Sequence, residues 1–205
     1  MDESKYQTQV VVLDTCILIS NVLRFLSLGL AKAGYFQPVW SPQIREEWLR
    51  NASRLWEVER SELEQDWALW EQWFPLADQG IVHNYQEGLR YSDPKDWHVI
   101  AAARAAQHSF PGGCVGILTK NTKDFNRSEL KRLDIARWAP DAFFCELWPR
   151  ARAVFMPLLQ QLPDAVRAPG KEPLSTEALL KRERLFELAK RYTAVNNGMV
   201  QLDLG

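Results

Sequence analysis

Acidic side chains occur in four separate segments of the chain, at places where they could act on a phosphate together. These acidic residues are Asp14, Glu46, Glu47, Asp93, Asp96 and Asp124. Several carboxylate oxygens without an accompanying cysteine–histidine pattern favour Mg²⁺ or Mn²⁺ over zinc. Magnesium held by carboxylates activates water for in-line attack and neutralises charge on the phosphate oxygens. The residue types therefore indicate metal-dependent phosphodiester chemistry.

Each acidic residue also has a structural interpretation, which stays open when the residue is taken alone. Asp93 stands before Pro94, and Asp-Pro is a common helix start in which the carboxylate caps the helix. Asp96 suits the first turn of the same helix, and Asp124 suits a turn. Asp14 is different, because it follows four apolar residues directly and a carboxylate is costly there without a partner. The three histidines have no metal-ligand spacing among themselves, and we assign them structural or surface roles.

Short apolar runs alternate with amphipathic stretches, which is typical of an α/β fold with a parallel sheet. Residues 10–13 and 114–118 suit buried strands, and each run is followed directly by a polar residue, Asp14 or Thr119. Weaker strands are expected at residues 36–40, 80–82 and 135–138. Ligands of such sheets bind at the carboxyl ends of the strands. We therefore expect the acidic residues to gather along one edge of one sheet.

Pairs of a capping residue and a proline mark where two helices begin, at Ser41-Pro42 and at Asp93-Pro94. The first pair places Glu46 and Glu47 in the early turns of a helix, and the second does the same for Asp96. Beyond residue 148 the pattern indicates a helical C-terminal extension, with one amphipathic helix over residues 175–193. The predicted domains are residues 1–148 and 149–205.

Composition and charge favour a globular cytoplasmic protein with one basic patch. The formal net charge is −1, so no overall basic field points to nucleic acid. Residues 119–137, however, hold six Lys or Arg against three acids, next to the expected site. Scattered cysteines fit a reducing compartment, and residues 1–9 lack the pattern of a signal peptide. The longest apolar stretch, residues 10–30, is interrupted by polar side chains and does not suit a membrane span.

Four motifs together resemble the PIN-domain nucleases, and especially the bacterial branch that includes VapC-type toxins of toxin–antitoxin systems. The motifs are Val-Val-Leu-Asp14-Thr15-Cys, Ser-Pro-Gln-Ile-Arg-Glu-Glu47-Trp, Asp93-Pro-Lys-Asp96-Trp-His and Leu-Thr119-Lys-Asn121-Thr-Lys-Asp124-Phe. Each motif alone is weakly specific, but the four keep the order and approximate spacing of the family. The resemblance covers roughly residues 9 to 148.

The resemblance implies a Rossmann-like PIN fold with a central parallel sheet of four to five short strands, dependence on Mg²⁺ or Mn²⁺, and cleavage of single-stranded RNA. The residues that match the family's acidic quartet are Asp14, Glu47, Asp96 and Asp124. The residues that match its supporting polar positions are Thr15, Thr119 and Asn121. We choose Glu47 over Glu46 because the family's acid precedes an aromatic or aliphatic residue, here Trp48. Asp93 is either an accessory ligand or only the helix cap.

The resulting hypothesis is an endoribonuclease, which on this resemblance could be the toxin of a toxin–antitoxin pair. Three aspartates of the quartet would hold metal, and Glu47 would hold metal or orient the attacking water. The basic residues expected to hold substrate phosphates are Lys120, Lys123 and Arg127. The Trp-rich stretch between Glu47 and Gly80 and the tail beyond Trp148 exceed the usual domain, and either could dock an antitoxin or a second protomer.

Two other functions remain as alternatives. The first is a PIN-like module that binds RNA or protein without catalysis, although such a module would often have lost members of the quartet. The second is a phosphohydrolase of another Rossmann-like family, with Asp14 as a covalent nucleophile. That chemistry needs a second acid closely after the first, and the residue two positions after Asp14 is Cys16.

Overall fold

The computed structural model describes residues 9–167 and 170–198, and these fall into two compact units. The first unit contains residues 9–19 and 34–139, and the second contains residues 20–33 and the described residues from 140 onward. The predicted domains, with their boundary after residue 148, follow a different division and stay a prediction. Residues 1–8, on which the expected localisation partly rests, lie outside the described residues.

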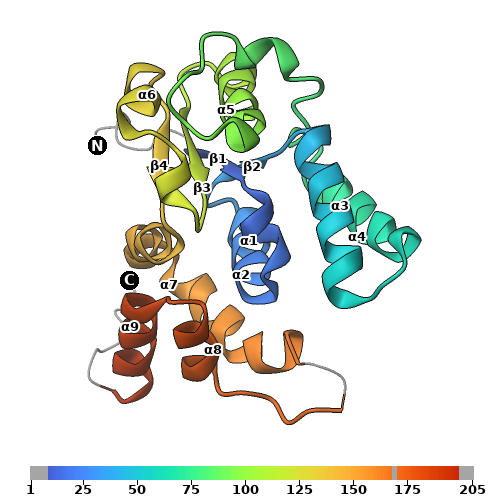
Figure 1. Ribbon diagram of the computed structural model, residues 1–205. Helices are drawn as coiled ribbons and strands as arrows, with labels where there is room; N and C mark the ends of the chain where they lie inside the picture. Colours follow the sequence, from blue (N-terminus) through green and yellow to red (C-terminus); the bar gives the residue numbers. More distant parts are fainter. Residues whose placement is uncertain (1–8, 168–169, 199–205) are drawn as a thin grey trace. The chain divides into compact units, whose positions relative to one another are not determined.

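A parallel sheet of four strands forms the centre of the first unit (Figure 1). Its strands, in spatial order, are β2 (Gln37–Val39), β1 (Gln9–Leu13), β3 (Cys114–Leu118) and β4 (Ala136–Trp138). Leu13 pairs with Leu118, which in turn pairs with Trp138, so these three strands end in register. The predicted α/β class and parallel sheet are confirmed, and the carboxyl ends of the strands meet at one edge.

Helices surround this sheet in the first unit. They are α1 (Thr15–Ile19), α3 (Pro42–Trp56), α4 (Arg60–Trp73), α5 (Trp97–Ser109) and α6 (Arg127–Arg132), with the short 3₁₀ helices η2 (His83–Gln86), η3 (Pro94–Asp96) and η4 (Thr122–Asp124). Helix α5 packs on β1 and β3, and its buried alanines allow the close approach. Ser41 caps α3 through its hydroxyl, which accepts a hydrogen bond from the amide of Ile44, as the Ser41-Pro42 pair predicts.

Tryptophan side chains hold α3 against α4. Trp48 of α3 packs on Trp67 and Trp70 of α4, with ring centroids 5.5 and 4.8 Å apart, and all three rings are buried. The indole nitrogen of Trp48 also donates to the carbonyl of Leu18, at 3.2 Å. Because Glu47 is the neighbour of Trp48 on α3, this packing fixes the place of Glu47 relative to α1.

The predicted strand at residues 80–82 is wrong. Gly80 has a φ of 63°, and the side chain of Ile81 is 90% exposed. The backbone instead makes one isolated bridge a few residues earlier, where the amide of Trp40 donates to Ala77 and the amide of Gln79 donates to Trp40. Of the apolar pair after Gly80, Val82 is buried against Ala101 and Ala105 of α5, and neither residue forms a strand.

The second unit is helical. Its helices are α2 (Asn21–Lys32), α7 (Pro140–Ala165), α8 (Thr176–Arg182) and α9 (Phe186–Asn196). Gly29 of α2 lies so close to Leu158 of α7 that a Cβ at residue 29 would be 2.8 Å from that leucine. The single helix expected over residues 175–193 is two helices, because Arg184 adopts a left-handed conformation with φ 61° between them. The helical C-terminal extension is confirmed.

In the described part of the chain, none of the helices combines the length and the apolar character needed to cross a bilayer.

Candidate active site

Asp14 lies where β1 ends and α1 begins, and it is 5% exposed. Its Oδ2 accepts a hydrogen bond from the hydroxyl of Thr119 at 2.6 Å and another from the thiol of Cys16 at 3.0 Å. Thr119 follows β3, so the parallel register of β1 and β3 brings these residues together. Within the described residues Oδ1 of Asp14 takes no hydrogen bond. One oxygen of the carboxylate is therefore held by the protein, and the other remains for a ligand.

Glu47, like Asp14, is held by the protein through only one of its carboxylate oxygens. Its Oε2 accepts a hydrogen bond from the hydroxyl of Thr15 at 3.0 Å and lies 3.1 Å from Nε2 of His98. These donors lower the pKa of Glu47, the contact with His98 having the largest effect, so the carboxylate is ionised and Nε2 is the protonated nitrogen. Nδ1 of His98 is buried without a partner among the described residues. Oε1 of Glu47 takes no hydrogen bond in the described chain.

Asp96 and Asp124 come from two different loops that are joined through the backbone. The amide of Asp93 donates to the carbonyl of Asp124 at 2.8 Å, and the amide of Asp96 donates to the carbonyl of Asp93 at 2.9 Å. Asp96 stands in the capping position of α5, yet its carboxylate makes no capping hydrogen bond. The residue is half-buried. Its carboxylate is thus available to a ligand and is not used in capping the helix.

Electrostatics shows that the aspartates affect one another. Burial raises the pKa of Asp96 to about 6, and the neighbouring charges of Asp14 and then Asp124 act in the same direction. Burial likewise raises the pKa of Asp14, although the hydrogen bonds from Thr119 and Cys16 oppose the shift. Like charges within reach of each other favour protonation of one of them. The aspartates therefore form an electronegative site that a cation would relieve.

The donor set of this site fits a divalent cation that prefers oxygen. In residues 9–167 and 170–198, no three His, Cys, Asp or Glu side chains are already arranged as a group that could hold an ion. The oxygens of Asp14 and Glu47 that take no hydrogen bond, together with the unused carboxylates of Asp96 and Asp124, are nevertheless hard ligands of the kind that Mg²⁺ and Mn²⁺ prefer. The repulsion between the aspartates supplies a reason for such an ion to bind.

Other residues singled out in the sequence occupy distinct places. Glu46 forms an exposed ion pair with Arg60 at 2.8 Å, whereas the adjacent Glu47 makes the contacts described above. Asp93 caps η3 by accepting a hydrogen bond from the amide of Lys95 at 3.0 Å. Asn121 donates its backbone amide to the Thr119 hydroxyl, at 3.0 Å. The side chains of the three predicted phosphate-binding residues, Lys120, Lys123 and Arg127, are exposed.

Glu129 is an acidic residue whose importance the sequence did not reveal. It is 1% exposed, and its carboxylate accepts hydrogen bonds from the backbone amides of Arg90, Tyr91 and Ser92, the shortest at 2.8 Å. The Ser92 hydroxyl accepts from the amide of Asn126 at 2.9 Å. These bonds fasten the loop before Asp93 to the start of α6. Glu129 therefore positions the two loops that carry Asp93, Asp96 and Asp124.

His98 and Cys16 also contact the acidic residues and were not assigned to the site from the sequence. His98 stands two positions after Asp96 on α5, and Cys16 stands two positions after Asp14. Burial, and then the nearby Asp14 carboxylate, raise the pKa of Cys16, so its thiol keeps the proton that it donates to Asp14. Their closeness in sequence to the predicted acids was the signal that could have identified them.

Comparison with known proteins supports the family. A family model described as PIN domain matches residues 10–123, which is more than half of the chain. The match includes Asp14, Glu47 and Asp96, and it ends one residue before Asp124. Neither the comparison with curated proteins nor the one with solved structures gives a match. The parallel sheet, the acidic edge and the family match agree, and the chain belongs to the PIN-domain family, whose members are generally nucleases.

Proposed function

We propose that this protein is a metal-dependent endoribonuclease that hydrolyses phosphodiester bonds in single-stranded RNA. The observation that carries the proposal is the convergence of Asp14, Asp96 and Asp124, whose mutual repulsion contributes to raising the pKa of Asp96 to about 6. A partly buried edge with several like charges is unfavourable for a purely structural site. It suits a site that binds a cation during the reaction.

The side chains would divide the work as follows. A divalent ion bound at this edge would activate water and neutralise charge on the phosphate oxygens. Asp14, Asp96 and Asp124 would hold the ion. Glu47, fixed through Oε2 by Thr15 and His98, would present Oε1 either to the ion or to the attacking water. The protein hydrogen bonds on Asp14 and Glu47 would keep the remaining oxygens in one orientation.

Substrate and setting follow from the resemblance to VapC-type toxins. We propose single-stranded RNA as the substrate, with Lys120, Lys123 and Arg127 binding its phosphates from the exposed loop and helix beside Asp124. On the same resemblance we propose that this protein is the toxin of a toxin–antitoxin pair and that it acts in the cytoplasm. An antitoxin or a second protomer would be its protein partner.

The test is cleavage of mixed single-stranded RNA by purified protein with Mg²⁺, with Mn²⁺ and with a chelator. We expect cutting only with metal, and a loss of about 1,000-fold or more in Asp14→Asn, because carboxylate-bound metal contributes several kcal/mol to such reactions. Asp66→Asn, a change of an exposed aspartate on α4, is the matched control and should cut normally. Single-stranded DNA serves as the alternative substrate.

Two outcomes would contradict the proposal. A fully active Asp14→Asn protein would show that the carboxylates are not the site. No cutting with either metal, in a protein whose circular dichroism shows a folded state, would favour the non-catalytic binding module.

A further inference from the structure

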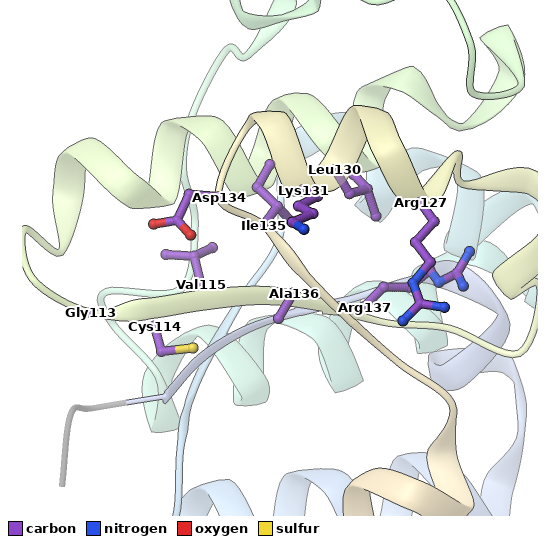
Figure 2. Close-up of a pocket in the computed structure, with 10 residues that line it drawn as sticks. All are labelled: Gly113, Cys114, Val115, Arg127, Leu130, Lys131, Asp134, Ile135, Ala136 and Arg137. Carbon is purple, nitrogen blue, oxygen red and sulfur yellow. The ribbon is translucent and has the colours of Figure 1, made fainter. Parts of the chain in front are cut away.

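A cavity of about 540 Å³ lies beside the sheet in the first unit, between α6 and the strands β3 and β4 (Figure 2). The lining residues used below are Val115, Arg127, Lys131, Asp134, Ile135 and Arg137. Arg127 and Arg137 lie at one end of the cavity, and Asp134 lies at the other (Figure 2). Ligand sites commonly have volumes of about 300–1,000 Å³, so the cavity is large enough for part of a polymer or a small molecule.

The charge of the cavity favours an anion. Three cationic side chains line it, against the single acid Asp134. Arg127 and Lys131 are four residues apart on α6, and both line the cavity, so they form a row with a rise of about 6 Å along the helix. Val115 and Ile135 form the floor of the cavity, where they are 2% and 4% exposed. Cations in a row of this spacing suit successive phosphates of a nucleic-acid backbone.

The cavity is directly linked to the loop that carries Asp124. The guanidinium of Arg137 donates hydrogen bonds to the backbone carbonyls of Thr122 and Phe125, the second at 2.6 Å. These carbonyls stand on either side of Asp124 in the sequence. One cationic side chain of the cavity is thus fixed to the segment that bears a proposed metal ligand. From Arg137 the lining extends to Cys114 at the amino end of β3, whereas the acidic edge lies at the carboxyl end of that strand.

We propose that this cavity is a subsite for the phosphate backbone of the nucleic-acid strand, beyond the bond that is cut. Lys131 and Arg127 bind successive phosphates. The identity of the strand as RNA rests on the proposed function. The subsite makes longer strands bind more tightly than short ones, because only a longer strand reaches from the acidic edge to Lys131.

The experiment measures binding, so it does not depend on cleavage. Asp14→Asn protein is titrated into fluorescein-labelled single-stranded RNA, a dinucleotide and a twelve-nucleotide strand, at several salt concentrations. In this background we expect Lys131→Gln to weaken binding of the long strand by about 4-fold and to reduce the salt slope by roughly 0.7, the value for one lost phosphate contact on a single strand. Lys131→Glu should weaken it further. Lys171→Gln, at another exposed lysine, is the control and should bind as its parent does.

The outcomes separate this subsite from the proposed activity. If Lys131→Gln binds the long strand as tightly as Lys171→Gln does, the subsite is overturned, even where wild type cuts RNA. The subsite is also overturned if the Asp14→Asn protein binds no RNA. The Lys131 variants could lose affinity in the expected order, with Lys131→Glu weaker than Lys131→Gln, while wild type cuts nothing. That result would support the subsite and contradict the proposed nuclease activity. Circular dichroism of each variant shows that the exposed substitution leaves the fold intact.

Discussion

Two acidic residues of the first unit, the buried Glu129 and the half-buried Asp96, have opposite surroundings. Glu129 receives hydrogen bonds from three consecutive backbone amides, and although its burial acts to raise the pKa, these donors together hold it below the ordinary value. Asp96 has no comparable donors, and burial with its aspartate neighbours raises its pKa to about 6. The protein itself satisfies the charge of Glu129. The charge around Asp96 is left for something else to satisfy, which is what separates a structural carboxylate from a ligand-binding one.

The largest expected effect is on stability, in Glu129→Ala. The change removes the acceptor of three backbone amides, those of Arg90, Tyr91 and Ser92, and the amide of Ser92 is buried. We therefore expect the free energy of unfolding to fall by about 3 kcal/mol. Urea denaturation monitored by circular dichroism measures it. Glu46→Ala removes two exposed ion pairs, with Arg45 and Arg60, and should change stability by about 1 kcal/mol or less. Equal losses of unfolding free energy in the two variants would show that Glu129 does not hold the two loops together.

Asp96→Asn tests the other side of the comparison. Removing one of several repelling charges should raise the melting temperature of the metal-free protein. The same change should reduce metal-dependent cleavage by about 100-fold or more, since even residues that only support a ligand contribute about 10- to 100-fold. Scanning calorimetry with chelator and an RNA cleavage assay give the two readouts. A melting temperature below that of wild type without metal would contradict the repulsion.

A smaller effect is expected when one donor to Glu47 is removed. Thr15→Val deletes the hydrogen bond to Oε2 and should lower cleavage by about 10-fold, because the carboxylate loses part of its orientation. Thr176→Val is a matched control, since that buried threonine donates to the Leu159 carbonyl in the second unit. Both variants should lose about 1 kcal/mol of stability, yet only the first should lose activity. If Thr15→Val and Thr176→Val cleave RNA at the same rate, Thr15 does not position Glu47.

The mildest test is the pH dependence of stability without metal. The folded-state pKa of Asp96 lies above its ordinary value of 3.8, so near pH 6 the folded protein binds more protons than the unfolded chain does. Stability should therefore fall as pH rises through 6, by at most about 1.4 kcal/mol per unit, and Asp96→Asn should flatten this slope. Glu129 acts in the opposite sense, and its contribution is lost as pH falls below its ordinary value of 4.5. Melting temperatures between pH 2 and pH 8 cover both ranges. A wild-type slope near pH 6 that matches the slope of Asp96→Asn would contradict the assignment.

Local patterns in the sequence were enough to predict most of the strands and helices that position the site. An apolar run ending at Asp14, and another ending at Thr119, predicted β1 and β3 because a strand buried on both faces needs consecutive apolar residues. The Ser41-Pro42 pair predicted the start of α3, where the Ser41 hydroxyl caps the helix. These features depend on neighbouring residues alone, which is why a single sequence shows them.

Long-range partners could not be predicted in this way. Glu129 looks like an ordinary first-turn acid of a helix, and its three partners lie 37 to 39 residues earlier in the chain. His98 has no metal-ligand spacing with the other histidines, so that spacing did not indicate its place in the site. The residue that it contacts, Glu47, lies 51 residues earlier in the chain. Ile81 has the apolar character of a strand residue, but the turn at Gly80 exposes it. In each case the deciding contact is tertiary.

The close approach of Gly29 to Leu158 has a consequence for folding during synthesis. Helix α2 is made early, but its partner α7 begins only at Pro140. At about 5–20 residues per second, a ribosome needs roughly 6 to 25 s to go from the first residue of this pair to the second. Throughout that delay the apolar face of α2 lacks its partner helix, while the segments that carry the carboxylates have already been synthesised. A nascent chain that has just reached residue 140 thus contains every proposed ligand together with an α2 whose apolar face still lacks its partner helix.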